Sequence, residues 1–280
     1  MKLNSPLRYP GGKSQMYEYV KEIICKNNLQ TKTYVEPFAG GFGIGIKLLK
    51  EKVVEKAIIN DFDFRIYAFW KAVFFNSKKL IDGIKDLEIS IDEWKKQKMI
   101  SKKCPKKTYL KVAISTLFLN RTNFSGILKG NPIGGISQNG KYKMDCRFPK
   151  EKIIEAIHEI SKFKDRVKIY NLDAKEFILK ILNKNPNSFF INFDPPYVKN
   201  GKSLYTNFYE TKDHKELKTE ISNLKSDWIM TYDCDNLILK EYAKYPIKKF
   251  NLRYSAKNKI KGTELFISKK EYINSIQNIA

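Results

Sequence analysis

Residues 190–197 read Phe-Ile-Asn-Phe-Asp-Pro-Pro-Tyr, and this stretch indicates both the fold class and the position of a site. An apolar run of strand length, residues 188–193, leads directly into Asp194 and two prolines. Proline has no N–H and a fixed φ, so the strand must end there and the loop that follows must be rigid. In open α/β sheets, ligands bind at the carboxyl ends of the strands, which is where this sequence places Asp194.

The loop after this strand suits a planar substrate that carries an exocyclic amine. The Asp194 carboxylate and the Pro195 carbonyl can each accept a hydrogen bond, and the Tyr197 ring offers a face for stacking. An ordinary strand-ending turn is the alternative, because Asp-Pro commonly opens turns. The predicted catalytic residues are Asp194, Pro195, Pro196 and Tyr197.

The composition predicts a reduced, cytoplasmic protein without a metal site. A chain of 280 residues with 42% hydrophobic content can bury the core of one large domain, or of one domain with an insertion. No stretch approaches the roughly 20 apolar residues of a membrane span, and the N-terminus lacks the apolar run of a signal peptide. The four cysteines are far apart and only two histidines are present, so the sequence shows neither closely spaced zinc ligands nor a disulfide framework.

Positive charge is concentrated in one segment. The chain carries 53 Lys and Arg against 30 Asp and Glu, a formal net charge of +23. Residues 95–150 contain fourteen basic residues and a single acid, and so hold more than half of the net charge. A general richness in lysine would explain scattered charges but not this concentration. A membrane surface is the less suitable partner, because no basic helix here has a clean apolar face. The segment therefore indicates a polyanionic partner such as nucleic acid.

Strands and helices alternate along most of the chain. Further strands are predicted around Val35 and at residues 57–60, 166–170 and 228–232. Helices are predicted at residues 65–76, 78–87, 108–120, 150–163 and 213–223. Residues 247–254 and 263–268 are predicted to close the chain as a hairpin around Lys261-Gly262. This order predicts an α/β fold with a Rossmann-like, doubly wound, mostly parallel sheet, which residues 75–160 interrupt.

Two glycine-containing stretches are candidates for ligand binding. A glycine-rich turn, residues 36–45, separates a predicted strand from a helix, and Asp61 follows Gly41 by twenty residues. An acid at this spacing commonly holds ribose hydroxyls, although the glycine pattern is not that of a dinucleotide site. In residues 10–14, Pro-Gly-Gly-Lys-Ser, a phosphate loop is excluded because Leu7 stands where its first glycine is needed. The two glycines leave N–H groups open, and Lys13 can meet a carboxylate.

Residues 121–148 form a long stretch without helical periodicity, broken by five glycines and a proline. Structureless loops of this length inside a domain are usually functional, and a loose connection is the alternative. Basic and amide side chains in this stretch suit contact with phosphates and base edges. The predicted nucleic-acid contacts are Arg121, Asn123, Lys129, Gln138, Lys141 and Lys143.

Four motifs in order resemble the Dam-type class of DNA adenine N6-methyltransferases. They are Pro-Gly-Gly-Lys at residues 10–13, Glu-Pro-Phe-Ala-Gly-Gly at 36–41, Asn-Asp at 60–61, and Asp-Pro-Pro-Tyr at 194–197. The likeness spans the whole chain and extends to residues 120–126 and 263–267. Bacterial and phage members of this class modify a short DNA sequence, often within restriction–modification systems. The resemblance therefore implies a site-specific enzyme that acts on double-stranded DNA in a bacterial or phage-infected cell.

The resemblance also implies which residues bind S-adenosylmethionine. The cofactor would lie across the turn at residues 36–41 with Asp61 on its ribose, while Asp173 matches the acid near its adenine. Tyr9 and Lys13 match the opening motif, although members usually carry Trp at the position of Tyr9. The implied cofactor residues are Tyr9, Gly11, Gly12, Lys13, Glu36, Pro37, Phe38, Gly40, Gly41, Asp61, Asp173 and Asp194. Residues 1–74 and 164–280 would form the catalytic domain and residues 75–163 an inserted target-recognition domain.

The implied reaction is methyl transfer to N6 of an adenine that has left the duplex stack, without a metal or a covalent intermediate. Residues 133–138 differ from the GATC-specific members, so GATC recognition is not implied. A methyltransferase acting on RNA or on a protein glutamine amide remains an alternative, because such an amine also fits this pocket chemistry. A non-catalytic nucleic-acid-binding protein is a second alternative, but it does not explain the acids at the strand ends. The zinc deaminase signature is absent.

Overall fold

The computed structural model describes residues 5–8, 16–198, 209–253 and 261–272. The predicted cofactor residues Tyr9, Gly11, Gly12 and Lys13 lie outside these ranges. The chain forms two compact units. We call residues 13–62 and 172–280 the sheet unit, and residues 1–12 and 63–171 the helical unit, although the strand at residues 167–170 also belongs to the second of these.

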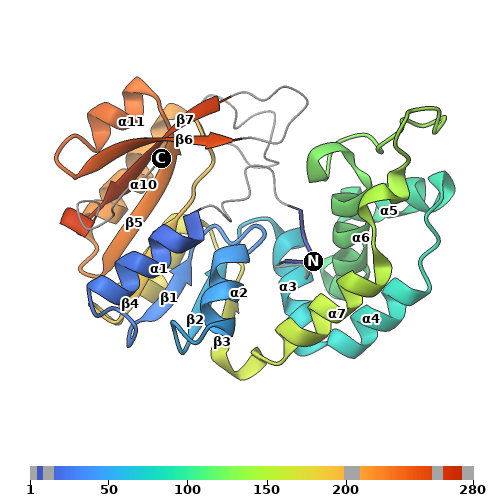
Figure 1. Cartoon of the computed structure of the whole chain (residues 1–280), viewed down its shortest axis with the longest axis horizontal. Helices are drawn as coiled ribbons and strands as arrows, with labels where there is room; N and C mark the ends of the chain where they lie inside the picture. Colours follow the sequence, from blue (N-terminus) through green and yellow to red (C-terminus); the bar gives the residue numbers. More distant parts are fainter. Residues whose placement is uncertain (1–4, 9–15, 199–208, 254–260, 273–280) are drawn as a thin grey trace. The chain divides into compact units, whose positions relative to one another are not determined.

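Seven strands form one sheet in the order β3-β2-β1-β4-β5-β7-β6 (Figure 1). Their bounds are β1 Thr33–Glu36, β2 Ala57–Asn60, β3 Val167–Tyr170, β4 Phe189–Phe193, β5 Asp227–Asp233, β6 Ile247–Arg253 and β7 Lys261–Ser268. β1 pairs in parallel with β2 and β4, and β4 pairs in parallel with β5. β7 runs antiparallel to both β5 and β6. The Rossmann-like, mostly parallel sheet with a C-terminal hairpin is confirmed.

The hairpin differs from the prediction in one respect. Lys261 and Gly262 belong to β7, where they pair with Arg253 and Leu252 of β6. The predicted turn at these two residues was therefore wrong. Glycine is a strong local turn signal, and the pairing partners of a glycine inside a strand leave no mark on the sequence.

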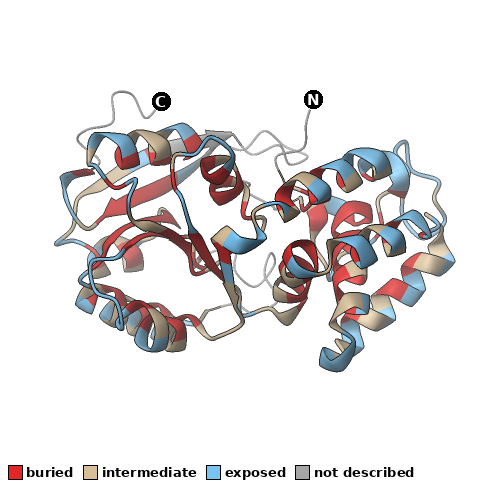
Figure 2. Cartoon of the chain, turned by 90° about the horizontal axis from the view of Figure 1, so that it is seen from below, coloured by how far each residue is buried: buried red, intermediate tan, exposed pale blue. Residues whose placement is uncertain are grey.

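The core of the sheet unit comes from strands that are buried on both faces. All five residues of β4 and all four of β2 are buried, as expected for central parallel strands covered by helices. The helices of this unit are α1 Tyr17–Lys26, α2 Gly43–Lys50, α8 Ala174–Phe177, α10 Thr211–Asn223 and α11 Asn236–Glu241. α1 packs beside α2, and α8 packs beside α10. Figure 2 shows the buried strands in red, with the exposed faces of the helices in blue.

The helical unit contains α3 Phe64–Phe75, α4 Ser77–Lys85, α5 Ile91–Lys103, α6 Tyr109–Thr122 and α7 Lys150–Ser161. α3 packs against α6 and α7, which explains why it belongs to this unit although the sequence placed residues 65–74 with the catalytic domain. Sequence analysis did not predict α5. Its buried residues include Gln97 and Ser101, so its inner face lacks the apolar repeat by which a helix is detected.

Residues 123–148 contain only short 3-10 turns, at Phe124–Gly126 and Met144–Arg147, and an isolated bridge between Asn123 and Pro132. The predicted loss of helical periodicity is confirmed. Side chains nevertheless order this stretch, since the Asn123 amide nitrogen donates to the carbonyls of Ile127 (2.8 Å) and Leu128 (3.2 Å). Side-chain hydrogen bonds therefore hold this loop in a defined conformation, and it is not a loose connection.

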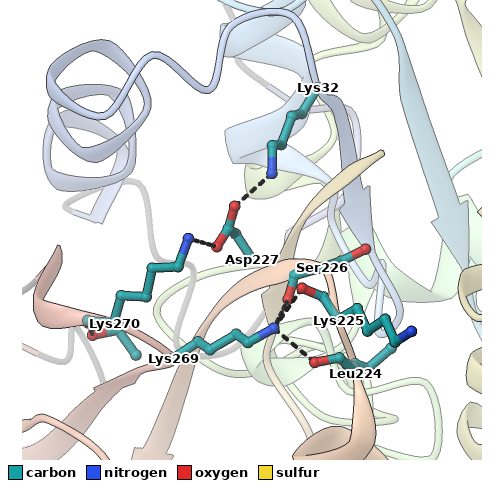
Figure 3. A network of polar contacts seen from close by, with 8 residues as sticks. Lys32, Leu224, Lys225, Ser226, Asp227, Lys269 and Lys270 are labelled. Atoms are coloured by element: carbon teal, nitrogen blue, oxygen red, sulfur yellow. Dashed lines mark hydrogen bonds and ion pairs between the residues drawn. The ribbon is translucent and has the colours of Figure 1, made fainter. Parts of the chain in front are cut away.

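A buried carboxylate joins the starts of β1 and β5 to the end of β7 in the sheet unit (Figure 3). Asp227, at the start of β5, accepts from Lys32 (2.5 Å) and pairs with Lys270 (2.8 Å). Lys269 donates to the carbonyls of Leu224 (2.7 Å) and Ser226 (3.0 Å), just beyond the end of α10. Burial alone would raise the pKa of Asp227, but the hydrogen bonds from its partners outweigh burial and lower that pKa to about 2.

We expect Asp227→Asn to lower the free energy of unfolding by about 2 kcal/mol at pH 7. The folded-state pKa lies below the unfolded value of about 4, so this stability is present above pH 4 and is lost as the pH falls towards 2. Urea unfolding at pH 7 and pH 3 should show the two proteins converging at the lower pH. Asp92→Asn is the matched control, because Asp92 also pairs with a lysine but is 92% exposed, and its effect should stay within about 0.5 kcal/mol. Equal effects of the two variants would contradict the role of Asp227.

Candidate active site

The loop after β4 holds Asp194 in a fixed place. Pro195, Pro196 and Tyr197 are buried, whereas Asp194 itself is half-buried. The hydroxyl of Thr231, on the neighbouring strand β5, donates to Asp194 Oδ1 (3.2 Å). The backbone N–H of Val198 donates to Asp233 Oδ1 (3.0 Å), which anchors the far end of the same loop to β5. The carboxylate therefore stands on a rigid loop with its orientation supported by the adjacent strand.

A row of aromatic rings accompanies this loop. The ring of Tyr197 lies 6.3 Å from that of Tyr232 on β5, and the Tyr232 hydroxyl is 2.7 Å from His214 Nδ1 on α10. Tyr209 packs edge-on against both His214 (5.5 Å) and Phe38 (6.2 Å). Burial lowers the pKa of His214, so its ring is neutral at pH 7. Sequence analysis missed Tyr209, His214 and Tyr232, since single aromatic residues look like ordinary core residues.

Glu36, at the end of β1, is the acceptor in a buried network. Its Oε1 accepts from the Tyr34 hydroxyl (2.9 Å) and from the N–H of Gly45 (3.1 Å), near the start of α2. The Tyr34 hydroxyl in turn accepts from the Asn192 amide (2.9 Å). Burial raises the pKa of Glu36 to about 8, against the opposing effect of these hydrogen bonds. Because Glu36 takes a donor at the start of α2, that helix is poorly suited to bind a phosphate.

Asn60, the last residue of β2, joins the loops that follow three strands. Its amide nitrogen donates to the carbonyls of Pro37 and Leu172 (both 3.0 Å), and its side-chain oxygen accepts from the N–H of Leu172 (2.9 Å). Asp61 Oδ2 accepts from the N–H of Gly40 (3.0 Å), whose φ of 43° favours glycine. The turn at residues 37–40 is thus held against Asp61.

Carboxyl groups follow four of the strands. Glu36 ends β1, Asp61 follows β2, Asp194 follows β4, and Asp173 comes three residues after β3. Asp173 also caps α8 by accepting from the N–H of Lys175 (2.9 Å). Glu36, with its pKa of about 8, adds little negative charge at pH 7, but the other three acids favour a ligand with positive charge and free hydroxyl groups and disfavour a ligand with phosphates. Such an edge suits an ammonium, a sulfonium or a ribose diol better than a nucleotide phosphate.

The residues predicted to contact DNA fall into two groups. Arg121 is buried and donates to the carbonyls of Pro6 (2.5 Å) and Ser5 (3.2 Å), and Asn123 is fully buried, with its oxygen accepting from Trp94 Nε1 (2.7 Å). Both side chains therefore make hydrogen bonds within the helical unit and are not exposed for contact with DNA.

Lys129, Lys141 and Lys143 are exposed, as the prediction requires, and Lys143 also donates to the Gln138 carbonyl. The side chain of Gln138 donates to the Ile133 carbonyl (2.8 Å) and accepts from the N–H of Met144 (3.0 Å), so it too is engaged within the loop. Two aromatic residues of the same stretch are exposed. They are Phe124 (51% exposed) and Tyr142 (64% exposed).

The described ranges contain neither a membrane-spanning helix nor a cluster of metal ligands. None of the helices there is both long enough and apolar enough to cross a bilayer. Nor do those ranges bring three or more His, Cys, Asp or Glu side chains together as metal ligands.

Residues 9–262 match the family described as D12 class N6 adenine-specific DNA methyltransferase. The chain is 26% identical over 237 residues to the type II methyltransferase M.MjaIII of Methanocaldococcus jannaschii, a match that covers 78% of each protein. It is 24% identical over 270 residues to the type II methyltransferase M.CviBI of Paramecium bursaria Chlorella virus NC1A, covering 90% of this chain and 91% of that one. A family match across nearly the whole sequence agrees with the sheet order and with the acid-lined strand ends, and the chain belongs to the D12 class of N6 adenine-specific DNA methyltransferases.

Proposed function

We propose that the sheet unit binds S-adenosylmethionine and methylates N6 of an adenine that has been flipped out of duplex DNA. The observation that carries this proposal is Asp194, fixed by Thr231 at the end of a buried strand and followed by two prolines. The helical unit would read a short DNA sequence, as expected for a modification enzyme of a bacterial or phage restriction–modification system. The expected location in the cytoplasm stays a prediction.

The residues at the strand ends fit the cofactor. S-adenosylmethionine carries an ammonium, a sulfonium and a ribose diol, and it has no phosphate. Asp61 would accept from the ribose hydroxyls, and Asp173 from the adenine amine. Glu36 and the turn at residues 37–41 would hold the methionine part, together with the opening motif at residues 9–13. When bound, this cofactor supplies a methyl group that its sulfonium already activates for transfer.

Asp194 would act on the nucleophile. The N6 lone pair of adenine is delocalised into the ring, so the amine attacks poorly in its planar form. A carboxylate and the Pro195 carbonyl that accept both N6 hydrogens would hold this nitrogen towards a pyramidal geometry. The orientation of Asp194 by Thr231 (3.2 Å) means that little reorganisation is needed at the moment of reaction. Tyr197 would contribute an aromatic surface for the flipped base.

The helical unit is the proposed DNA-binding part. Exposed basic residues follow α5 and continue through the loop that contains Phe124 and Tyr142. Lysines suit the phosphates of the backbone or the acceptor atoms of guanine, and exposed aromatic rings suit the faces of bases. Among the predicted contacts, the exposed Lys129, Lys141 and Lys143 remain the candidates. Arg121 and Asn123 are buried, which favours a role in holding the helical unit together over direct contact with DNA.

Binding of S-adenosylmethionine should be measurable by titration calorimetry and should weaken by about tenfold or more in Asp61→Ala. The variant loses the acceptor for the ribose hydroxyls and also the partner of the Gly40 N–H. Glu55→Ala is the control, since Glu55 is an exposed acid close to the same strand and its removal should leave the affinity unchanged. Tight binding of ATP or of a nicotinamide dinucleotide in place of S-adenosylmethionine would overturn the proposal.

The substrate class can be tested by direct competition. The protein is incubated with S-adenosylmethionine labelled in its methyl group and with equal masses of duplex DNA, structured RNA and a glutamine-containing protein substrate. We expect label in the DNA alone. Label in the RNA or in the protein would support the alternative methyltransferases, and DNA binding with no label anywhere would support a non-catalytic protein.

A further inference from the structure

Lys98 lies in the most basic part of the sequence, but it is half-buried and its ammonium binds the protein's own backbone. From the middle of α5, Lys98 Nζ donates to three consecutive carbonyls, those of Leu128 (3.4 Å), Lys129 (2.8 Å) and Gly130 (2.7 Å). Its ammonium also lies 5.1 Å from the centre of the Trp94 ring. An ammonium has three N–H donors, and the carbonyls of the turn take up all three, so this lysine is a poor candidate for a phosphate contact.

The turn that Lys98 holds is also fixed from its other end. Asn123 donates to the carbonyls of Ile127 and Leu128, and its own oxygen is held by Trp94 Nε1 (2.7 Å). Trp94 and Lys98 are one turn apart on α5. The backbone carbonyls of residues 127–130 therefore all accept hydrogen bonds from side chains of the protein. These bonds restrain the backbone along the whole turn.

Backbone hydrogen bonds close the same turn. The N–H of Phe124 donates to the Asn131 carbonyl (3.0 Å), and the N–H of Gly130 donates to the Ile127 carbonyl (2.9 Å). Gly126 has a φ of +77°, and a Cβ on it would lie 2.7 Å from the Arg8 carbonyl, so this position requires glycine. The two large side chains that leave this turn exposed are Phe124 and Lys129.

We propose that Lys98 is a positioning residue for DNA specificity: it clamps the backbone of residues 127–130 so that Lys129 and Phe124 are presented to the bases in one fixed geometry. The proposal rests on the proposed function, since it assumes that this turn meets DNA. It separates Lys98 from Lys95 and Lys96 of the same helix, whose ammonium groups pair with acids at the surface. A fixed reading surface loses less entropy on binding and rejects a wrong base more strongly than a mobile one.

The test compares Lys98→Met with Lys95→Met, because both lysines lie on α5 and only their surroundings differ. The Lys95 side chain is 60% exposed and pairs with the surface residue Asp92. The methylated sequence is first mapped in DNA from cells that express the full chain. The probes are a duplex that carries this sequence and duplexes that differ from it by one base pair.

For Lys98→Met we expect the ratio of methylation rates on the two kinds of probe to fall roughly tenfold, the range of one good base contact. The slope of log affinity against log salt should not change, because no phosphate contact is lost. Amide hydrogen exchange at Gly126, Ile127 and Gly130 should become faster. Lys95→Met should leave the ratio of rates and the exchange unchanged.

The opposite pattern would overturn the proposal: a smaller salt slope in Lys98→Met, with specificity and exchange unchanged, would make Lys98 a phosphate contact. If Lys98→Met does not fold, Lys98→Arg decides the question. An arginine binds a phosphate equally well, but its planar guanidinium does not match three carbonyls in a turn. Lys98→Arg should therefore lose sequence specificity if Lys98 is a clamp, and should keep it if Lys98 is a phosphate contact. If no methylated sequence is found in the cells, the proposed function itself has failed. That outcome differs from a failure of the clamp proposal, in which DNA is methylated but the ratio of rates is unchanged in Lys98→Met.

Discussion

Asp194→Ala should lower the rate of methyl transfer by about 100-fold or more while the protein stays folded. The substitution removes the acceptor for the N6 hydrogen but leaves the buried strand β4 and the two prolines in place. DNA affinity should persist, because the proposed phosphate contacts belong to the helical unit. Single-turnover transfer of labelled methyl, together with the melting temperature, measures both expectations.

Thr231→Val gives a graded comparison for Asp194. The variant keeps the shape of the side chain and the carboxylate, and it loses only the hydrogen bond of 3.2 Å that orients Asp194. We expect a loss of roughly tenfold, between the unmodified protein and Asp194→Ala. Tyr197→Phe should keep most of the activity if the ring acts through stacking, whereas Tyr197→Ala should not. Near-normal activity of Asp194→Ala would contradict the proposed role of this residue.

DNA affinity should fall steeply with salt, with a log–log slope of about −0.9 for each neutralised phosphate. Replacing Lys102, Lys103, Lys106 and Lys107 with glutamine should make this slope shallower by up to about 3.6 and weaken binding to all sequences alike. These four lysines are exposed at and after the end of α5. Fluorescence anisotropy at several salt concentrations measures the effect.

The matched control for these four lysines is the pair Lys78 and Lys79. Both are exposed on α4, in the same unit but outside the basic segment. Their replacement with glutamine should leave the slope unchanged. A flat salt response of the unmodified protein, or an altered sequence preference in the fourfold variant, would mean that the four lysines only solvate the surface.

The sheet could be predicted from the sequence because its strands are local signals. Continuous apolar runs such as β4 need no partner to be detected, and an acid followed by two prolines marks the end of that strand. Helix α5 could not be predicted, since Gln97 and Ser101 stand where an apolar residue would show the repeat. Its inner face is specified by polar contacts, such as the Ser115 hydroxyl with the Gln97 carbonyl (2.6 Å).

Much of the candidate site depends on partners that are distant in the sequence. Arg121 and Asn123 look like DNA contacts in a basic, glycine-rich stretch, but Arg121 binds the carbonyl of Pro6, 115 residues away. Asn60 holds Leu172 across 112 residues. Lys98 differs from its exposed neighbours only through the carbonyls that face it. Residue type and spacing mark such positions as polar or basic, and the fold alone decides whether a charge meets a ligand or the protein's own backbone.

The identity of the methylated base tests the central claim most directly. The full chain is incubated with duplex DNA and S-adenosylmethionine carrying a deuterated methyl group, and the DNA is digested to nucleosides for mass spectrometry. We predict deuterated N6-methyladenine from the unmodified protein and at most about a hundredth as much from Asp194→Ala. Deuterated 4-methylcytosine, or an equal yield of N6-methyladenine from the variant, would contradict this account.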